Sequence, residues 1–140
     1  MRYMLDTCVL IDLIKDSDVL DKDVISIIKD YSNTLCVSFE TIREMIVLFN
    51  IGKLRGKGWN SSNDVLRFIT DDMGIVVLPL TAEVADTYSR LELNVQQNHK
   101  DPSDHIIISH AIANRITLIS SDTKFPFYCK QGLSLIVNRK

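Results

Sequence analysis

The sequence has few cysteines, glycines and prolines, and it has no long apolar run. Its three cysteines, Cys8, Cys36 and Cys129, lie far apart and form no C-x-x-C pair, which argues against a disulfide framework and a zinc ribbon. With 5 Gly and 3 Pro, the chain is neither collagen-like nor of low complexity. No stretch reaches the roughly 18 to 20 apolar residues of a membrane span, and Asp6 and Asp12 interrupt the apolar N-terminus. We therefore expect a cytoplasmic protein that does not associate with membranes.

The chain also lacks a strong charge of either sign. Sixteen Lys and Arg residues stand against 18 Asp and Glu residues, so the formal net charge is −2. A polyanionic partner would have to be held by local basic patches. Hydrophobic residues make up 46% of the chain, which is enough to bury a core. The length of 140 residues is close to the commonest domain size, so we expect residues 1–140 to form a single domain.

Hydrophobic periodicity predicts an alternation of strands and helices. Short apolar runs indicate strands at 3–5, 35–38, 75–78 and 117–120, with a candidate fifth strand at 133–137. Helical spacing of apolar residues indicates helices around 24–31, 42–49, 65–74, 84–91 and 102–112. The first of these includes Tyr31 in its apolar stripe. Thr81 and Asp101 are the expected N-caps of the last two, and Gly52 is an expected helix stop. This alternation is typical of an α/β fold with a parallel sheet that binds ligands at the carboxyl ends of its strands.

Carboxylates from distant parts of the sequence fall at that edge of the sheet. Asp6 and Asp122 follow the first and fourth strands. Glu44 lies in the early turns of one helix, and Asp101 and Asp104 lie in the first turn of another. Singly, each has an ordinary explanation, such as capping a helix or closing an Asx-turn. Together they would repel one another without a cation, and an all-oxygen donor set favours Mg²⁺ or Mn²⁺ over zinc. The placement therefore indicates phosphoryl-transfer chemistry.

Glu44 also heads a second apolar stripe on its helix, formed by Val47, Leu48 and Ile51. A helix that is apolar on two faces is covered on both, either within the chain or by another subunit.

The histidines and the common catalytic motifs point to no other chemistry. His105 and His110 are five residues apart on a helix and do not share a face, so we do not expect them to bind a metal together with His99. His105 is instead a candidate phosphate contact. The sequence has no G-x-G-x-x-G motif, no P-loop and no G-x-S-x-G motif.

Four blocks of the sequence, in order, resemble PIN-domain ribonucleases of the VapC type, the toxins of bacterial toxin-antitoxin pairs. MLDTCVLIDLI resembles the block that carries the first acid, which falls on Asp6. VSFETIREMIVLFNIGKL resembles the second block and puts its acid on Glu44. HKDPSDHIIISHA resembles the third block, usually H-R-D-P-F-D-R, with its acid on Asp104 and Asp101 as the helix cap. TLISSDTKF resembles the fourth and puts its acid on Asp122. The third block departs from the usual pattern, because Arg, Phe and Arg are replaced by Lys100, Ser103 and His105.

The resemblance implies a three-layer α/β/α fold with a central parallel sheet of about four to five strands. It also implies an Mg²⁺- or Mn²⁺-dependent endoribonuclease in which a metal-activated water hydrolyses RNA phosphodiester bonds. The implied partners are RNA, a cognate antitoxin protein and a second copy of the chain in a homodimer. The residues assigned to catalysis and metal binding are Asp6, Glu44, Asp104 and Asp122, with Asp101 as a further metal ligand.

RNA contacts are expected from a Gly- and Lys-rich loop and from residues beside the acids. Trp59, in the same loop, would either stack on a base or pack internally. The candidate RNA-binding residues are Lys53, Arg55, Lys57, Lys124, Thr7 and Ser121.

Other functions stay open at this stage. A catalytically degenerate PIN module that binds RNA or protein as a regulator is the main alternative. A DNA-directed nuclease of the wider PIN-like class would need insertions for which the chain has little room. A response-regulator-like signalling domain would need an Asp pair after the first strand, which is absent.

Overall fold

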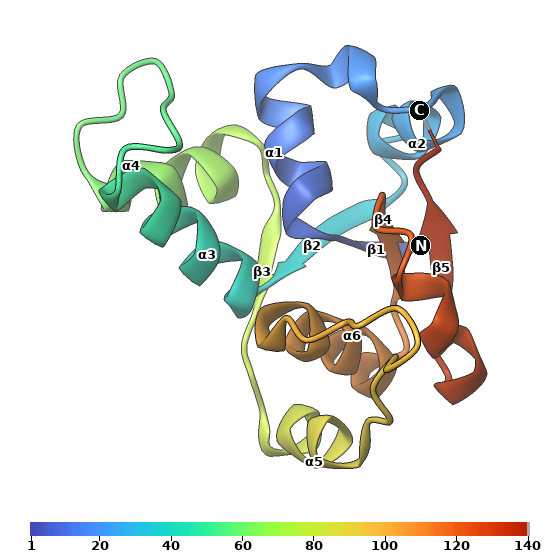
Figure 1. Cartoon of the computed structure of the whole chain (residues 1–140). Helices are drawn as coiled ribbons and strands as arrows, with labels where there is room; N and C mark the ends of the chain where they lie inside the picture. Colours follow the sequence, from blue (N-terminus) through green and yellow to red (C-terminus); the bar gives the residue numbers. More distant parts are fainter. Residues whose placement is uncertain (140) are drawn as a thin grey trace.

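A computed structural model describes residues 1–139 of the chain. At its centre is one five-stranded sheet in the order β3-β2-β1-β4-β5, with every neighbouring pair parallel (Figure 1). The predicted α/β class and parallel sheet are confirmed, and the candidate fifth strand is present. The strands are β1 (Arg2–Leu5), β2 (Thr34–Ser38), β3 (Val76–Leu78), β4 (Thr117–Ser120) and β5 (Leu135–Val137).

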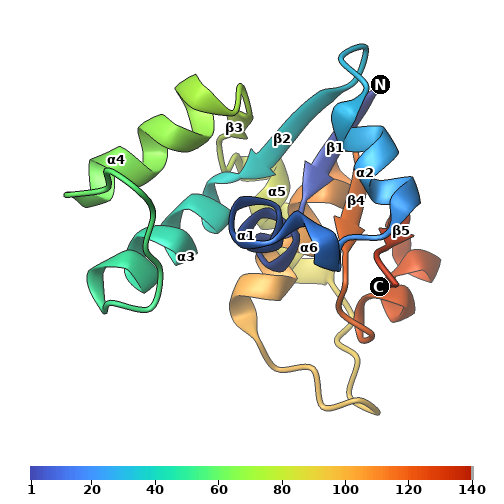
Figure 2. The same ribbon diagram turned by 90° about the horizontal axis from the view of Figure 1, so that it is seen from above.

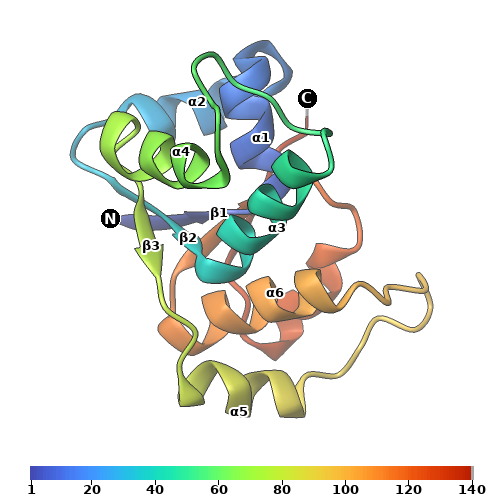
Figure 3. The same cartoon turned by 90° about the vertical axis from the view of Figure 1, so that its left-hand side faces the viewer.

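Helices connect the strands and cover both faces of the sheet. The α-helices are α1 (Thr7–Lys15), α2 (Lys22–Lys29), α3 (Phe39–Asn50), α4 (Ser62–Arg67), α5 (Ala82–Arg90) and α6 (Pro102–Asn114). Short turns of other helix types are η1 (Ser17–Val19), η2 (Phe68–Asp72) and η3 (Phe125–Gln131). In Figure 3, α1, α2 and α4 lie above the sheet and α5 and α6 lie below it. Among the described residues, no helix is both long and apolar enough to cross a bilayer.

Two hydrophobic cores lie on opposite faces of the sheet because side chains alternate along each strand. Leu5 of β1 and Ile119 of β4 pack into the core under α1 to α4. Their neighbours Met4 and Leu118 pack into the core against α6 and η3. This alternation produces the three-layer arrangement.

Capping residues fix where the helices begin. Asp101 accepts the N–H of Ser103 (2.9 Å) at the start of α6, with Pro102 in the first turn, and Thr81 accepts the N–H of Val84 at the start of α5. Both predicted N-caps are confirmed. In Figure 2, α1 is seen nearly end-on beside the arrowhead of β1, so the first connection begins at the carboxyl edge of the sheet.

Two local predictions are wrong. Helix α2 ends at Lys29, and Tyr31 is fully exposed in the following turn, outside the apolar stripe. The predicted helix 65–74 divides into α4 and the π-helical turn η2. The described residues do not cover the second apolar stripe of α3 and its C-cap, since Val47 and Ile51 are 43% and 59% exposed, so of the two alternatives, cover by another subunit stays open. Cys8, Cys36 and Cys129 are all free in the structure.

Candidate active site

Asp6 lies at the carboxyl edge of the sheet, directly after β1. Since Leu5 of β1 is paired with Ile119 of β4, Asp6 and the residues after Ser120 leave the sheet side by side. Asp6 is 4% exposed. Its Oδ2 accepts the hydroxyl of Ser120 (2.7 Å), and its Oδ1 accepts the N–H of Thr7 (2.9 Å). Burial raises the pKa of Asp6 above its ordinary value, against the opposing effect of these hydrogen bonds.

Glu44 reaches the same edge from the second turn of α3. The hydroxyl of Thr7 donates to Oε1 of Glu44 (2.6 Å) and lies 3.0 Å from the hydroxyl of Thr41, also on α3. One threonine therefore bridges the first two acids, because its N–H holds Asp6 and its hydroxyl holds Glu44. This use of the Thr7 hydroxyl, together with 8% exposure, leaves it little opportunity to contact RNA.

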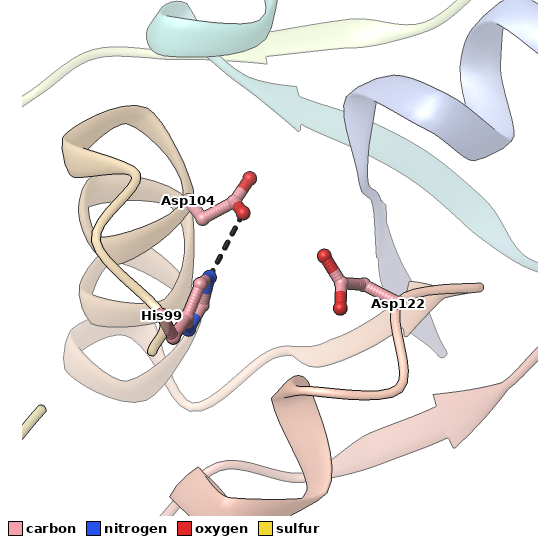
Figure 4. Close-up of side chains that lie close together, drawn as sticks. All are labelled: His99, Asp104 and Asp122. Carbon is pink, nitrogen blue, oxygen red and sulfur yellow. Dashed lines mark hydrogen bonds and ion pairs between the residues drawn. The ribbon is translucent and has the colours of Figure 1, made fainter. Parts of the chain in front are cut away.

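Asp104 and Asp122 complete the group, together with His99 (Figure 4). Asp104 lies in the first turn of α6, and Asp122 follows β4. The Nε2 of His99 is 2.9 Å from Oδ2 of Asp104, and one potential ligand atom from each of the three residues lies within 4.8 Å of the others. Asp122 is held at the edge by its own turn, in which Oδ1 accepts the N–H of Lys124 (2.8 Å).

The electrostatics of Asp104 reflect this crowding. Burial raises the pKa of Asp104 to about 8, and repulsion from four neighbouring carboxylates adds to the effect. These neighbours are Asp6, Asp101, Asp122 and Glu44. The four other carboxylates that the sequence placed at this edge thus lie close enough to Asp104 to act on its charge. Within residues 1–139, the group of three or more potential ligands whose atoms lie within 4.8 Å of one another consists of His99, Asp104 and Asp122.

Asp101 and Asp104 occupy different positions within the group. Asp101 is exposed and its Oδ1 caps α6, whereas Asp104 is mostly buried and hydrogen-bonded to His99. Asp104 is thus the acid of α6 that faces the other buried carboxylates.

Arg43, next to Glu44 in the sequence, forms its ion pair with Glu40 and not with a carboxylate of the site. Arg43 lies one residue before Glu44, but its Nε and Nη2 bind Oε1 and Oε2 of Glu40 at 2.8 and 2.5 Å. Although burial raises the pKa of Glu40, the hydrogen bonds and charge of Arg43 hold it below its ordinary value. Glu40 is 3% exposed, so this pair is a fixed feature of α3.

The histidines behave differently from the sequence expectation. His105 is 3% exposed, and its ring packs on that of His99 with centroids 4.7 Å apart, so the prediction that it contacts a phosphate is wrong. His99, whose metal binding we did not expect, lies beside Asp104 and Asp122. The signal was present, because His99 is the histidine of the H-R-D-P-F-D-R-like block.

The basic loop lies between α3 and α4 and packs beside the end of α1. Lys53, Arg55 and Lys57 are exposed. Arg55 and Lys57 line a cleft of about 330 Å³ together with Ile14 and Lys15 of α1 and with Gly56, Trp59 and Phe68. The indole of Trp59 packs edge-on between Phe49 and Phe68, so of the two roles considered for it the structure shows internal packing.

Two further RNA-binding candidates lie near Asp122. Lys124 is half-buried, and its backbone is part of the Asp122 turn. The hydroxyl of Ser121 accepts a hydrogen bond from the side chain of Asn138 (2.9 Å). A larger groove of about 900 Å³ lies between α1 and α2, and none of the site carboxylates lines it.

The residues fit a divalent cation bound by oxygen. Within residues 1–139, the two ion pairs made by Arg or Lys are Arg43–Glu40 and Arg90–Asp86, so none of the five site carboxylates forms an ion pair with an Arg or Lys of these residues. Buried carboxylates without such partners are expected either to bind protons or to bind a cation. Carboxylate oxygens are the donors that Mg²⁺ and Mn²⁺ prefer.

Fold and site together define an α/β protein whose acidic sheet edge is suited to a divalent cation. The family model of the PIN domain matches residues 3–130, and the chain belongs to this family. A comparison with curated proteins found no match.

Solved structures with the same fold extend over nearly the whole chain. VapBC2 from Rickettsia felis, bound to a DNA fragment from their promoter, is similar with a TM-score of 0.72 and 23% identity over 99% of both chains. VapBC-1 from nontypeable Haemophilus influenzae has a TM-score of 0.72 and 23% identity over 98% of both. FitAcB from Neisseria gonorrhoeae has a TM-score of 0.63 and 20% identity over 96% of both. At these identities, the similarity establishes the fold.

Proposed function

We propose that this protein is a VapC-type toxin: a Mg²⁺- or Mn²⁺-dependent endoribonuclease that hydrolyses RNA phosphodiester bonds. The observation that carries the proposal is the group of carboxylates from four separate segments at one sheet edge, with the pKa of Asp104 at about 8 and no described Arg or Lys paired to it. Membership of the PIN-domain family supports nuclease activity. The VapBC neighbours support the toxin assignment.

The acids of the site would have different roles in binding the cation. Asp6, Glu44 and Asp104 would bind the cation, with Asp122 completing the acidic group and Asp101 contributing charge at the rim. When bound, such a cation lowers the pKa of a water and neutralises charge that develops on the phosphate. Thr7 and Ser120 orient the first two acids through uncharged hydrogen bonds, so these donors do not offset the negative charge of either carboxylate.

Protein partners are part of the proposal. The neighbours solved as toxin-antitoxin complexes support a cognate antitoxin as partner. The exposed apolar side chains of α3 and its C-cap, Phe39, Val47 and Ile51, support a further protein contact, such as a second copy of the chain in a homodimer. We also propose that residues 1–140 act as a single PIN-like domain.

The proposal is tested by incubating total RNA with the purified protein in Mn²⁺, in Mg²⁺ or in EDTA. Asp6→Asn is the matched control, because asparagine can still cap α1 while losing the charge. Glu44→Gln is the second variant. Metal-dependent cleavage that both variants lose supports the ribonuclease. Cleavage of supercoiled DNA but not RNA would favour a DNA-directed nuclease, and no metal-dependent cleavage of either would favour a degenerate binding module.

A further inference from the structure

A chain of hydrogen bonds runs from the backbone to Asp104 through two buried rings. The N–H of Asn94 lies 3.0 Å from the hydroxyl of Tyr128. That hydroxyl lies 3.0 Å from Nδ1 of His99, and Nε2 of His99 lies 2.9 Å from Oδ2 of Asp104. Tyr128 is fully buried and His99 is 3% exposed, so neither ring can exchange its hydrogen-bond partner for bulk water.

An ionised Asp104, as required of a cation ligand, selects one arrangement of hydrogens in this chain. An ionised carboxylate can only accept, so Nε2 of His99 carries a hydrogen and donates it to Asp104. The other nitrogen of a neutral imidazole, Nδ1, then carries no hydrogen and accepts from the hydroxyl of Tyr128. The Tyr128 oxygen in turn accepts the backbone N–H of Asn94.

The position of the His99 ring is fixed on several sides. The rings of His105, Phe125 and Tyr128 surround it with centroid distances of 4.7, 5.7 and 5.6 Å. Its backbone N–H binds the carbonyl of Asn94 at 3.0 Å. The ring cannot rotate away from Asp104 without displacing these contacts.

Uncharged donors also hold two other acids of the site, Asp6 and Glu44. Asp6 and Glu44 accept hydrogen bonds from a serine hydroxyl, a threonine hydroxyl and a backbone N–H. All these donors are uncharged, as is the His99 imidazole in this arrangement. An uncharged donor orients a carboxylate and leaves its negative charge available, whereas a lysine or arginine would neutralise it.

We propose that His99 and Tyr128 are positioning residues that hold Asp104 in the orientation required of a cation ligand, and that His99 is not itself a ligand. The inference rests on the proposed function. In this arrangement Nε2 carries a hydrogen and the lone pair of Nδ1 accepts from Tyr128, so His99 has no free donor atom for a metal. A partner that orients a ligand in this way typically changes metal affinity by about 10- to 100-fold.

Two measurements on the full chain test the proposal. The first is long-range ¹H–¹⁵N NMR of the imidazoles, which shows which ring nitrogen of His99 carries the hydrogen, without metal and after saturation with Mg²⁺. The second is the affinity for Mn²⁺ alone by calorimetry, for wild type, His99→Phe, His99→Gln and Tyr128→Phe. His105→Phe is the matched control, because phenylalanine keeps an aromatic ring packed on His99 and His105 has no hydrogen bond to an acid within residues 1–139. Thermal unfolding of each metal-free variant shows that it is folded.

We expect the hydrogen on Nε2 in the wild type saturated with Mg²⁺, in which Asp104 is ionised. His99→Phe should weaken Mn²⁺ binding by about 10- to 100-fold, and His99→Gln should restore part of it because its amide also donates. In Tyr128→Phe, the His99 tautomer with its hydrogen on Nε2 should be less strongly favoured over the one with its hydrogen on Nδ1. His105→Phe should bind Mn²⁺ like the wild type. A hydrogen on Nδ1 in the Mg²⁺-saturated protein, loss of the Nε2 hydrogen on adding Mg²⁺, or unchanged affinity in His99→Phe would each overturn the positioning role.

The two proposals fail in different ways. A wild-type protein that binds no Mn²⁺ contradicts the proposed function and the positioning role together. A wild type that binds Mn²⁺ and cleaves RNA, with His99→Phe equal to it in affinity, contradicts the positioning role alone.

Discussion

Replacing Asp104 by asparagine should make the metal-free protein more stable at neutral pH. The pKa of Asp104 is about 8 in the folded protein, whereas an aspartate in an unfolded chain has a pKa of about 4. Between these values the folded state binds one proton more than the unfolded state, so the free energy of unfolding falls as the pH rises. One proton changes this free energy by about 1.4 kcal/mol for each pH unit. From pH 5 to pH 7, Asp104 should therefore destabilise the wild type by on the order of 2 to 3 kcal/mol.

Asparagine removes this dependence while keeping an oxygen that can accept from His99. At pH 5 the two proteins should have similar stability, and at pH 7 Asp104→Asn should be the more stable by roughly the 2 to 3 kcal/mol that the wild type has lost. The assay is urea unfolding in EDTA at pH 5, 6 and 7. Burial lowers the pKa of His99, His105 and His110, so through these residues the folded protein loses stability as the pH falls. Both proteins contain all three histidines, so this effect largely cancels in the difference between their stabilities.

The outcome that refutes this reasoning is a stability difference that is the same at pH 5 and pH 7. Asp86→Asn, at an exposed carboxylate of α5, is the control and should leave the pH dependence of the wild type unchanged. Saturating Mn²⁺ should stabilise the wild type at pH 7 and should stabilise Asp104→Asn much less, because a ligand that binds the folded state shifts the unfolding equilibrium.

Three further outcomes follow from other contacts. Ser120→Ala removes the hydroxyl that holds Asp6 and should weaken Mn²⁺ affinity by about 10-fold in calorimetry, with little change in the circular dichroism spectrum. Replacing Lys53, Arg55 and Lys57 together by alanine should weaken RNA binding and reduce the slope of log K against log salt by roughly 2, if each contacts one phosphate; an unchanged slope would place the loop away from RNA. Gly56→Ala should destabilise the protein by about 1 to 3 kcal/mol in urea unfolding followed by the fluorescence of Trp59, because a Cβ at position 56 would overlap the indole ring.

The features predicted from the sequence were those that depend on local patterns. Strand runs, the N-caps Thr81 and Asp101, and the sheet edge at which the acids meet all follow from short stretches of residues and from parallel topology. The boundary of α2 was less predictable, because the solvated turn after Lys29 overrides the apolar spacing that would include Tyr31.

The hydrogen bonds that orient the acids could not be predicted in this way. The contact of Thr7 with Glu44 joins residues 37 positions apart, and the contact of Tyr128 with His99 joins a loop to a 3₁₀ turn. Such contacts depend on side-chain rotamers and on the path of irregular backbone, which hydrophobic periodicity does not encode. The placement of His99 was missed although the third block of the resemblance contains this histidine.

The sheet order has a consequence for how the protein is made. The first strand occupies the centre of the sheet, and its neighbour β4 is the fourth in the chain, so the hydrogen bond from Ser120 to Asp6 joins residues 114 positions apart. Ribosomes add about 5 to 20 residues per second, so the N-terminal acid waits roughly 6 to 20 s for this partner during synthesis. Until then the nascent chain has neither the fourth strand nor Asp122 at its acidic edge. If the protein cuts RNA as proposed, a growing chain is inactive until β4 and Asp122 have been made, and the ribosome that makes it is spared for that time.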